Sequence, residues 1–191
     1  MDALQMMTEF RSVHTVVDMG TILDLVHRVC QHGQDMANCD SCKQSSQSPM
    51  VAFSALVEQC LSLFEAACST YNITLKNAML DADVLAFEQR LPHFVCIKSK
   101  TVLGQMELDN EESGYLVRML LNRSLAELLE ILEILRGILQ LRSKETSHFP
   151  RTGATPLRVC ESSVESTIHR VTMFMEQIEI ESSKDLGPPF L

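Results

Sequence analysis

The spacing of apolar and polar residues predicts one long helix from Asp109 to Arg142. Asp109 and Glu112 have the three-residue spacing of a capping box, in which each side chain accepts a hydrogen bond from the other residue's backbone N–H. At a rise of about 1.5 Å per residue the helix would be roughly 50 Å long, so other helices should pack around it. Its apolar stripe is wider than one face. The stripe comprises Leu116, Met119, Leu120, Leu125, Leu128, Leu129, Leu132, Leu135, Ile138 and Leu139, widened by Leu121, Ile131, Ile134 and Leu141.

A second segment with helical spacing of apolar residues covers Ala3 to Met36. Val16 and Val17 belong to its stripe, and Gly20 is the expected position of a break or kink. The segment therefore predicts one long helix or two short ones. The apolar pattern stops between His32 and Ser48, where polar residues predict a loop.

Two further helices are predicted where a hydroxyl residue precedes a proline, at Ser48-Pro49 and at Thr155-Pro156. The hydroxyl can cap the helix, and proline at the first helical position loses no hydrogen bond. The first of these helices should extend to about Tyr71. Its expected buried face comprises Phe53, Leu56, Val57, Cys60, Leu61, Leu63, Phe64 and Cys68. The stripe of the second comprises Leu157, Cys160, Val164, Ile168, Val171, Met175 and Ile178.

The remaining segments have weaker patterns. Between Asn72 and Lys100 a short helix is predicted near Ala82 to Arg90, and Leu91 to Phe94 has the composition of a turn or extended link. Val102 to Leu108 should be extended, leading into the capping box. The polar stretch from Ser143 to Thr155 predicts a flexible connection.

The composition supports a helical domain. The chain has 191 residues, 46% hydrophobic, with only 7 glycines and 6 prolines, and it contains no long alternating run that would predict a sheet. We therefore predict an all-α fold, a single-domain helical bundle around a long central helix. The domain should span residues 1–181, and residues 182–191 should form a loose C-terminal tail.

The charge balance disfavours direct contact with nucleic acid. Lys and Arg number 16 against 25 Asp and Glu, a formal net charge of −9, and the basic residues are not clustered. No apolar run reaches the roughly 18 residues of a membrane span, and the N-terminus lacks the pattern of a signal peptide. We therefore expect no membrane association and an intracellular protein. Glu127, Glu130 and Glu133 should form a solvated face of the long helix.

The seven cysteines are predicted to be reduced, because an odd number in a chain of this size favours small buried thiols over disulfides. Cys39 and Cys42 form a CxxC pair in a polar loop that Cys30 could approach. Zinc needs four ligands and a second pair is missing, so we predict no metal site. Cys30, Cys39 and Cys42 are the weak candidates for such a site. No cofactor is predicted. The pair could instead order the loop or oxidise on isolation. Core positions are expected for Cys60, Cys68 and Cys160.

The sequence contains none of the familiar catalytic motifs, such as a nucleophile elbow, a phosphate-binding loop or a His-Glu-x-x-His helix. His27 and His32 are expected on the surface, and His93 is more simply a structural histidine than a catalytic one. The abundant methionines are best explained as core filling. If an apolar pocket exists, it should lie between the central helix and the irregular segment. Its candidate lining comprises Tyr71, Phe87, His93, Phe94, Tyr115 and Met119.

Three stretches together resemble a known family. They are Cys30 with Cys39-Asp-Ser-Cys42, the segment Val57 to Cys68, and the segment Val102 to Glu112 with the leucine-rich helix that follows. In order and pattern they resemble the regulatory region of fungal zinc binuclear-cluster transcription factors of the aflatoxin regulatory protein family. The resemblance covers roughly residues 17–175. It implies a helical regulatory domain of secondary metabolism.

The chain departs from that family because it lacks the module of six closely spaced cysteines that binds DNA through two zinc ions. The resemblance implies a regulatory domain that acts through protein contacts or metabolite sensing, in the nucleus. The alternative is a stand-alone biosynthetic enzyme or small-molecule-binding protein in the cytoplasm, cofactor-free and assisting a cyclisation in an apolar pocket. The expected partner is a protein or an apolar metabolite, and a homodimer is left open.

Overall fold

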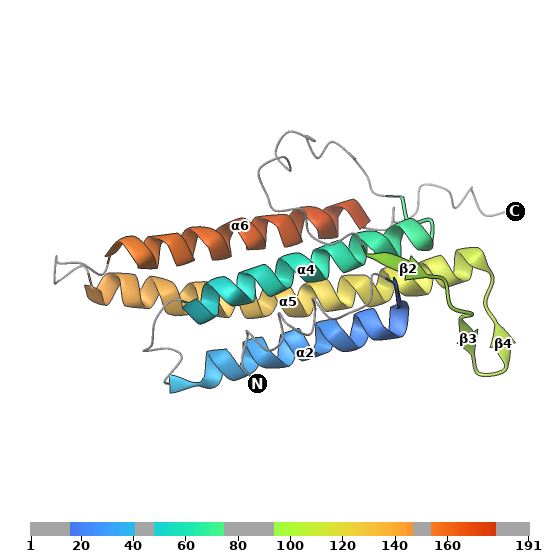
Figure 1. The fold of residues 1–191 in the computed structure, drawn as a ribbon, viewed down its shortest axis with the longest axis horizontal. Helices are drawn as coiled ribbons and strands as arrows, with labels where there is room; N and C mark the ends of the chain where they lie inside the picture. Colours follow the sequence, from blue (N-terminus) through green and yellow to red (C-terminus); the bar gives the residue numbers. More distant parts are fainter. Residues whose placement is uncertain (1–15, 41–47, 75–93, 147–153, 179–191) are drawn as a thin grey trace, which may run out of the picture.

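The computed structural model describes residues 16–40, 48–74, 94–146 and 154–178. Four helices form the body of the molecule and lie side by side along its long axis (Figure 1). The predicted all-α fold is confirmed. The predicted tail, the short helix near Ala82 to Arg90 and residues 91–93 lie outside the described residues. The helices are α2 (Met19–Asn38), α4 (Ser48–Thr70), α5 (Asn110–Thr146) and α6 (Ala154–Ile178).

Successive helices run in opposite directions along the bundle (Figure 1). Helices α2 and α6 each pack against both α4 and α5, and α4 also contacts α5. The contact between α5 and α6 is the most extensive in the molecule. Helix α5 therefore contacts all three other helices, as expected of a central strut, although α4 does the same.

The start of α5 is the predicted capping box. The Glu112 backbone N donates to Asp109 Oδ1 at 2.9 Å, and the Asp109 backbone N donates to Glu112 Oε2 at 2.9 Å. The helix ends at Thr146, four residues beyond the predicted end. Most of its stripe is buried or half-buried, but Met119, Ile134 and Leu141 are 62%, 46% and 63% exposed. The most buried leucines of the helix are Leu121, Leu125, Leu128, Leu132, Leu135 and Leu139.

The start of the first described helix differs from the prediction. Val16 and Val17 are not helical but belong to strand β1 (Val16–Asp18), which pairs in parallel with β2 (Val95–Ile97). Helix α2 begins at Met19, because Asp18 Oδ1 accepts a hydrogen bond from the Thr21 backbone N at 2.9 Å and caps it. The predicted break near Gly20 is therefore a helix start.

Helix α2 also continues further than predicted, to Asn38, so the loop does not begin at His32. The prediction that His32 lies on the surface is wrong: it is 8% exposed, because the longer helix places it three residues after buried Val29. Next to it, a Cβ atom at Gly33 would lie 2.6 Å from both Ile131 Cγ2 and Phe53 Cζ. Three helices therefore meet at a position that has room only for glycine.

Helices α4 and α6 follow their predictions closely. Helix α4 starts at Ser48 and ends at Thr70, and all eight residues of its expected buried face are buried. Helix α6 starts at Ala154, one residue before the predicted cap. Its stripe is buried except for Ile168 and Met175, which are half-buried. The Phe64 and Phe174 rings, 6.4 Å apart between centroids, connect the two helices.

Helix α4 is long and apolar enough to be compared with a membrane-spanning helix, which the sequence pattern had not indicated. Among the described helices, Pro49–Thr70 is the one whose length and mean hydropathy of 1.4 would permit a membrane crossing. Of its most apolar window, 61% is buried inside the bundle, as in the core helix of a globular domain. The helix is therefore weak support for a membrane span.

A small hairpin projects from one end of the bundle (Figure 1). Strand β3 (Val102–Leu103) pairs antiparallel with β4 (Met106–Glu107), and Gly104 adopts a φ of 66° in the turn between them. Val102–Leu103 and Met106–Glu107 are extended as expected, but a turn at residues 104–105 divides the segment, and the strand pairing was not predicted. The β2 strand is tied to α4 by a hydrogen bond from the Thr70 hydroxyl to the Cys96 carbonyl, at 2.9 Å.

Candidate functional site

The four described residues of the expected pocket do not face a common interior. Tyr71 is 3% exposed and Phe94 is half-buried against the core, whereas Tyr115 and Met119 are 55% and 62% exposed. Phe87 and His93 lie outside the described residues. The four described candidates therefore divide between the core and the solvent, and the prediction of a pocket with all six remains untested.

Tyr71 is held by contacts within the chain. Its hydroxyl accepts a hydrogen bond from the Ser99 backbone N at 3.4 Å, and Lys98 Nζ lies 5.5 Å from the centroid of its ring. Lys98 Nζ also donates to Asn110 Oδ1 at 2.7 Å. The aromatic side chain thus joins the end of α4 to the segment before α5, which is a structural role.

The cysteines behave as core residues in the part of the chain that the structure describes. Cys30, Cys60, Cys68 and Cys160 are buried with free thiols. Burial, with a smaller contribution from the charge of Glu127, raises the pKa of Cys30 to about 12. Buried thiols of this kind stay protonated and are poor nucleophiles.

Cys30 and Cys39, the described residues among the weak metal candidates, do not belong to a cluster of possible metal ligands. Cys30 is buried within α2, whereas Cys39 is half-buried just after the helix, where its backbone N donates to the Met36 carbonyl at 3.3 Å. Cys42 lies outside the described residues. Within the described ranges, no group of three or more His, Cys, Asp or Glu residues is placed to hold a metal ion.

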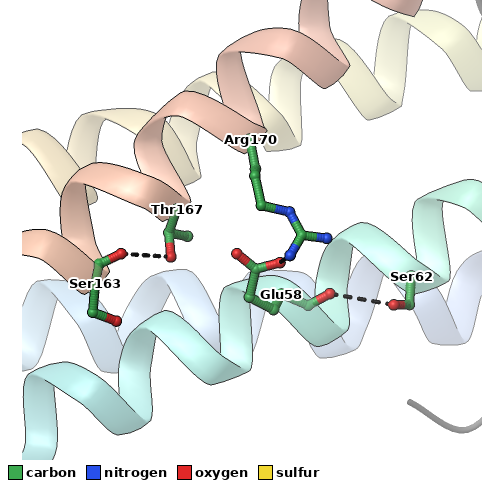
Figure 2. Close-up of polar contacts among 5 residues, drawn as sticks. All are labelled: Glu58, Ser62, Ser163, Thr167 and Arg170. Atoms are coloured by element: carbon green, nitrogen blue, oxygen red, sulfur yellow. Dashed lines mark hydrogen bonds and ion pairs between the residues drawn. The ribbon is translucent and has the colours of Figure 1, made fainter. Parts of the chain in front are cut away.

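A polar contact crosses the interface between α4 and α6 (Figure 2). Arg170 Nη1 lies 2.8 Å from Glu58 Oε2, and the two side chains are 34% and 19% exposed. Beside this pair, the Ser62 hydroxyl donates to the Glu58 carbonyl at 3.4 Å and the Thr167 hydroxyl to the Ser163 carbonyl at 3.0 Å. These groups are satisfied by the chain itself, so the contact serves to align the helices.

A shallow groove between α5 and α6 is the surface feature best suited to binding. It has a volume of about 620 Å³ and opens to solvent. Five of its residues lie on α5, at positions that cover two successive turns, and one lies on α6. The half-buried Leu129 and Met175 form its apolar floor together with Ile134, which is 46% exposed. The full lining comprises Ala126, Leu129, Glu130, Glu133, Ile134 and Met175.

Carboxylates border this groove. Glu133 pairs with Arg136 on the next turn of α5. Glu130, which is exposed, has no ion pair with any residue that the structure describes. The groove therefore combines an apolar floor with negative charge at its α5 edge.

The sequence contained one signal of this groove. The apolar stripe of the long helix was too wide for one face, and Ile134 was among the residues that widened it. The solvated face expected from Glu130 and Glu133 is real, but it forms the edge of an apolar groove. Met175 could not be assigned to the groove, because its position depends on how α6 packs.

A second hollow, of about 480 Å³, lies on the outer surface of α6 and is lined by Arg158, Val159, Ser162, Ser163 and Ser166. All of these residues belong to one helix, so the hollow is part of an exposed helical face and does not gather groups from different elements.

Comparison of the chain with protein-family models, with curated proteins and with solved structures found no match. The function must therefore be argued from the groove and the exposed surface.

Proposed function

We propose that this chain is a regulatory helical domain that acts by binding another protein, as its resemblance to the regulatory region of fungal zinc binuclear-cluster transcription factors implies. The observation that supports this proposal is the open groove between α5 and α6, with its apolar floor. Large apolar groups left at the surface of a folded domain often mark protein contacts. DNA binding would be supplied by another chain or segment.

Exposed apolar side chains continue along α5 beyond the groove. Met119 and Leu141 are 62% and 63% exposed, although a helix of this length buries most of its other leucines. Tyr115, one turn before Met119, is 55% exposed. Met119, Ile134 and Leu141 lie on one face of the same helix, and this gathering of exposed apolar side chains supports a surface that is covered by a partner.

The alternative, a cofactor-free pocket enzyme such as a cyclase, receives less support. Catalysis by confinement needs an enclosed apolar cavity with a few inward polar groups. The groove and the hollow on α6 both open to solvent. Among the described pocket candidates, Tyr115 and Met119 face away from the core.

The test is a tethered reporter in a fungal host. The whole chain is fused to an unrelated DNA-binding module, and expression of a reporter gene is compared with that driven by the module alone. We expect the fusion to change reporter output several-fold in either direction. A variant with Met119 and Leu141 both replaced by Ser should lose part of the effect while keeping the circular dichroism spectrum and melting temperature of the parent chain.

Unchanged reporter output would contradict the regulatory proposal. The companion measurement is a thermal-shift assay of the purified chain against pathway metabolites. Stabilisation by one compound, followed by turnover of that compound, would favour the enzyme, because a ligand that binds only the folded state raises its melting temperature.

A further inference from the structure

We infer that the groove between α5 and α6 is a docking site for a basic amphipathic helix of a partner protein. This inference rests on the proposed function and adds the chemistry of the partner and the place where it binds. The groove residues on α5 extend from Ala126 to Ile134, which is about 12 Å along the helix, or roughly two turns. An amphipathic helix with apolar residues at i, i+3 or i+4, and i+7 presents a ridge of matching length.

The composition of the groove suits such a ridge. Ala126 is small and exposed, so it leaves room above the floor for a leucine-sized side chain of a partner. Met175, which forms the α6 side, is unbranched and can change its rotamer to fit different apolar groups. Leu129 and Ile134 supply the rest of the apolar surface.

The charge of the groove selects the partner. Glu130 and Glu133 lie on the α5 side, so a docked helix would have carboxylates along one of its flanks. Lys or Arg residues beside the apolar ridge would pair with these carboxylates, whereas Asp or Glu would be repelled. A second copy of the chain is disfavoured for the same reason, since a symmetric contact would bring Glu130 of each copy to the same groove in a protein of net charge −9.

The experiment uses the full chain and a designed helical peptide as the probe. The basic peptide has Leu at i, i+3, i+4 and i+7 and Lys at the flanking positions, and in the acidic peptide every Lys is replaced by Glu. Binding is followed by fluorescence anisotropy of the labelled peptide at low and high salt. The Ala126→Arg variant places a bulky cation in the groove. Its matched control is Val159→Arg, which adds the same side chain to an exposed apolar site of α6 outside the groove.

We expect the basic peptide to bind about tenfold or more tightly than the acidic one, and its affinity to fall as salt is raised. Ala126→Arg should weaken binding by about tenfold or more, while Val159→Arg leaves it within about twofold. Replacement of Glu130 by Lys should weaken binding several-fold and reduce its dependence on salt. In methyl NMR spectra of the wild-type chain, the peptide should shift the resonances of Met175 and Ile134.

Several results would overturn the inference. They are absence of binding by the basic peptide, equal binding of the two peptides, equal losses of affinity in Ala126→Arg and Val159→Arg, or wild-type self-association that Ala126→Arg abolishes. The tethered reporter distinguishes failure of the docking inference from failure of the proposed regulatory function. If the tethered chain changes reporter output and Ala126→Arg leaves that output unchanged, the regulatory function stands and the groove is not its docking site. If the peptide binds at the groove and the tethered chain is inert, the docking site stands and the regulatory function fails.

Discussion

Replacement of Gly33 by Ala tests the close contact at which α2, α4 and α5 meet. The new Cβ atom would lie 2.6 Å from Ile131 Cγ2 and 2.6 Å from Phe53 Cζ, whereas carbon atoms in favourable contact are about 3.5–4.0 Å apart. Both neighbours are almost fully buried, Phe53 at 0% and Ile131 at 2% exposed, so neither can move into solvent. Overpacking of this kind costs about 1–3 kcal/mol, and replacing a helical glycine by alanine returns about 0.5–1 kcal/mol. We expect a net loss of roughly 0–2.5 kcal/mol, centred on about 1 kcal/mol, in the free energy of unfolding.

Gly137 provides the matched control, because it is also helical and a Cβ atom there would meet nothing within 4 Å. Gly137→Ala should therefore stabilise the protein by about 0.5–1 kcal/mol. Urea unfolding followed by circular dichroism gives the free energy of each variant. The gain from helix propensity cancels in the comparison, so the difference between the variants equals the cost of the contact, about 1–3 kcal/mol.

A second variant identifies the atoms responsible. Phe53→Leu removes the ring edge that approaches Gly33, at the cost of a cavity. Combined with Gly33→Ala, it should lose less stability than the sum of the two single losses, because the new methyl group would occupy part of the cavity. Equal stabilisation by Gly33→Ala and Gly137→Ala, or strict additivity with Phe53→Leu, would refute the steric explanation.

Two further predictions concern polar contacts. Asp18→Ala should cost about 1 kcal/mol near neutral pH, since it removes the cap of α2. The hydrogen bond from the Thr21 backbone lowers the pKa of Asp18 below its ordinary 3.8, so the stabilisation is fully present above that value and is lost as pH falls through the lower folded-state pKa. The difference in the free energy of unfolding between wild type and Asp18→Ala, measured by urea titration, should therefore shrink from neutral to acidic pH. A difference that does not change with pH would contradict the capping role. Glu58→Gln should cost about 1 kcal/mol, and less in an Arg170→Met background, because the ion pair at 2.8 Å is partly buried. A double-mutant cycle that shows no coupling energy between Glu58 and Arg170 would contradict a stabilising role for the ion pair.

Local signals in the sequence were enough to place most of the helices. The Asp109–Glu112 box and the Ser48-Pro49 start depend only on residues within one helical turn, so they could be identified without knowledge of packing. The buried face of α4 followed from periodicity alone, and all of its expected residues are buried. Strong local preference that agrees with the global pattern is the condition under which such prediction works.

The failures came where distant residues decide the structure. Val16 and Val17 fit a helical stripe, but their pairing with Val95 and Cys96 makes them a strand, and nothing near them in sequence specifies that partner. His32 is buried because α2 is longer than its apolar pattern indicated. Met119 fits the periodic stripe of α5, yet it is 62% exposed, since periodicity within one helix does not show how far its neighbours extend along it.

The unequal contacts among the helices also bear on the order in which the molecule assembles. Helices α5 and α6 are neighbours in sequence and share the most extensive interface, so they can associate after closing a short connection. The parallel pairing of β1 with β2 joins segments on either side of α2 and α4, and its loop-closure entropy is correspondingly larger. We therefore expect the α5–α6 hairpin to form early and exchange its amide hydrogens slowest, with the β1–β2 pairing forming last and opening first. The groove lies entirely on that hairpin, so it would persist while the β1–β2 pairing opens.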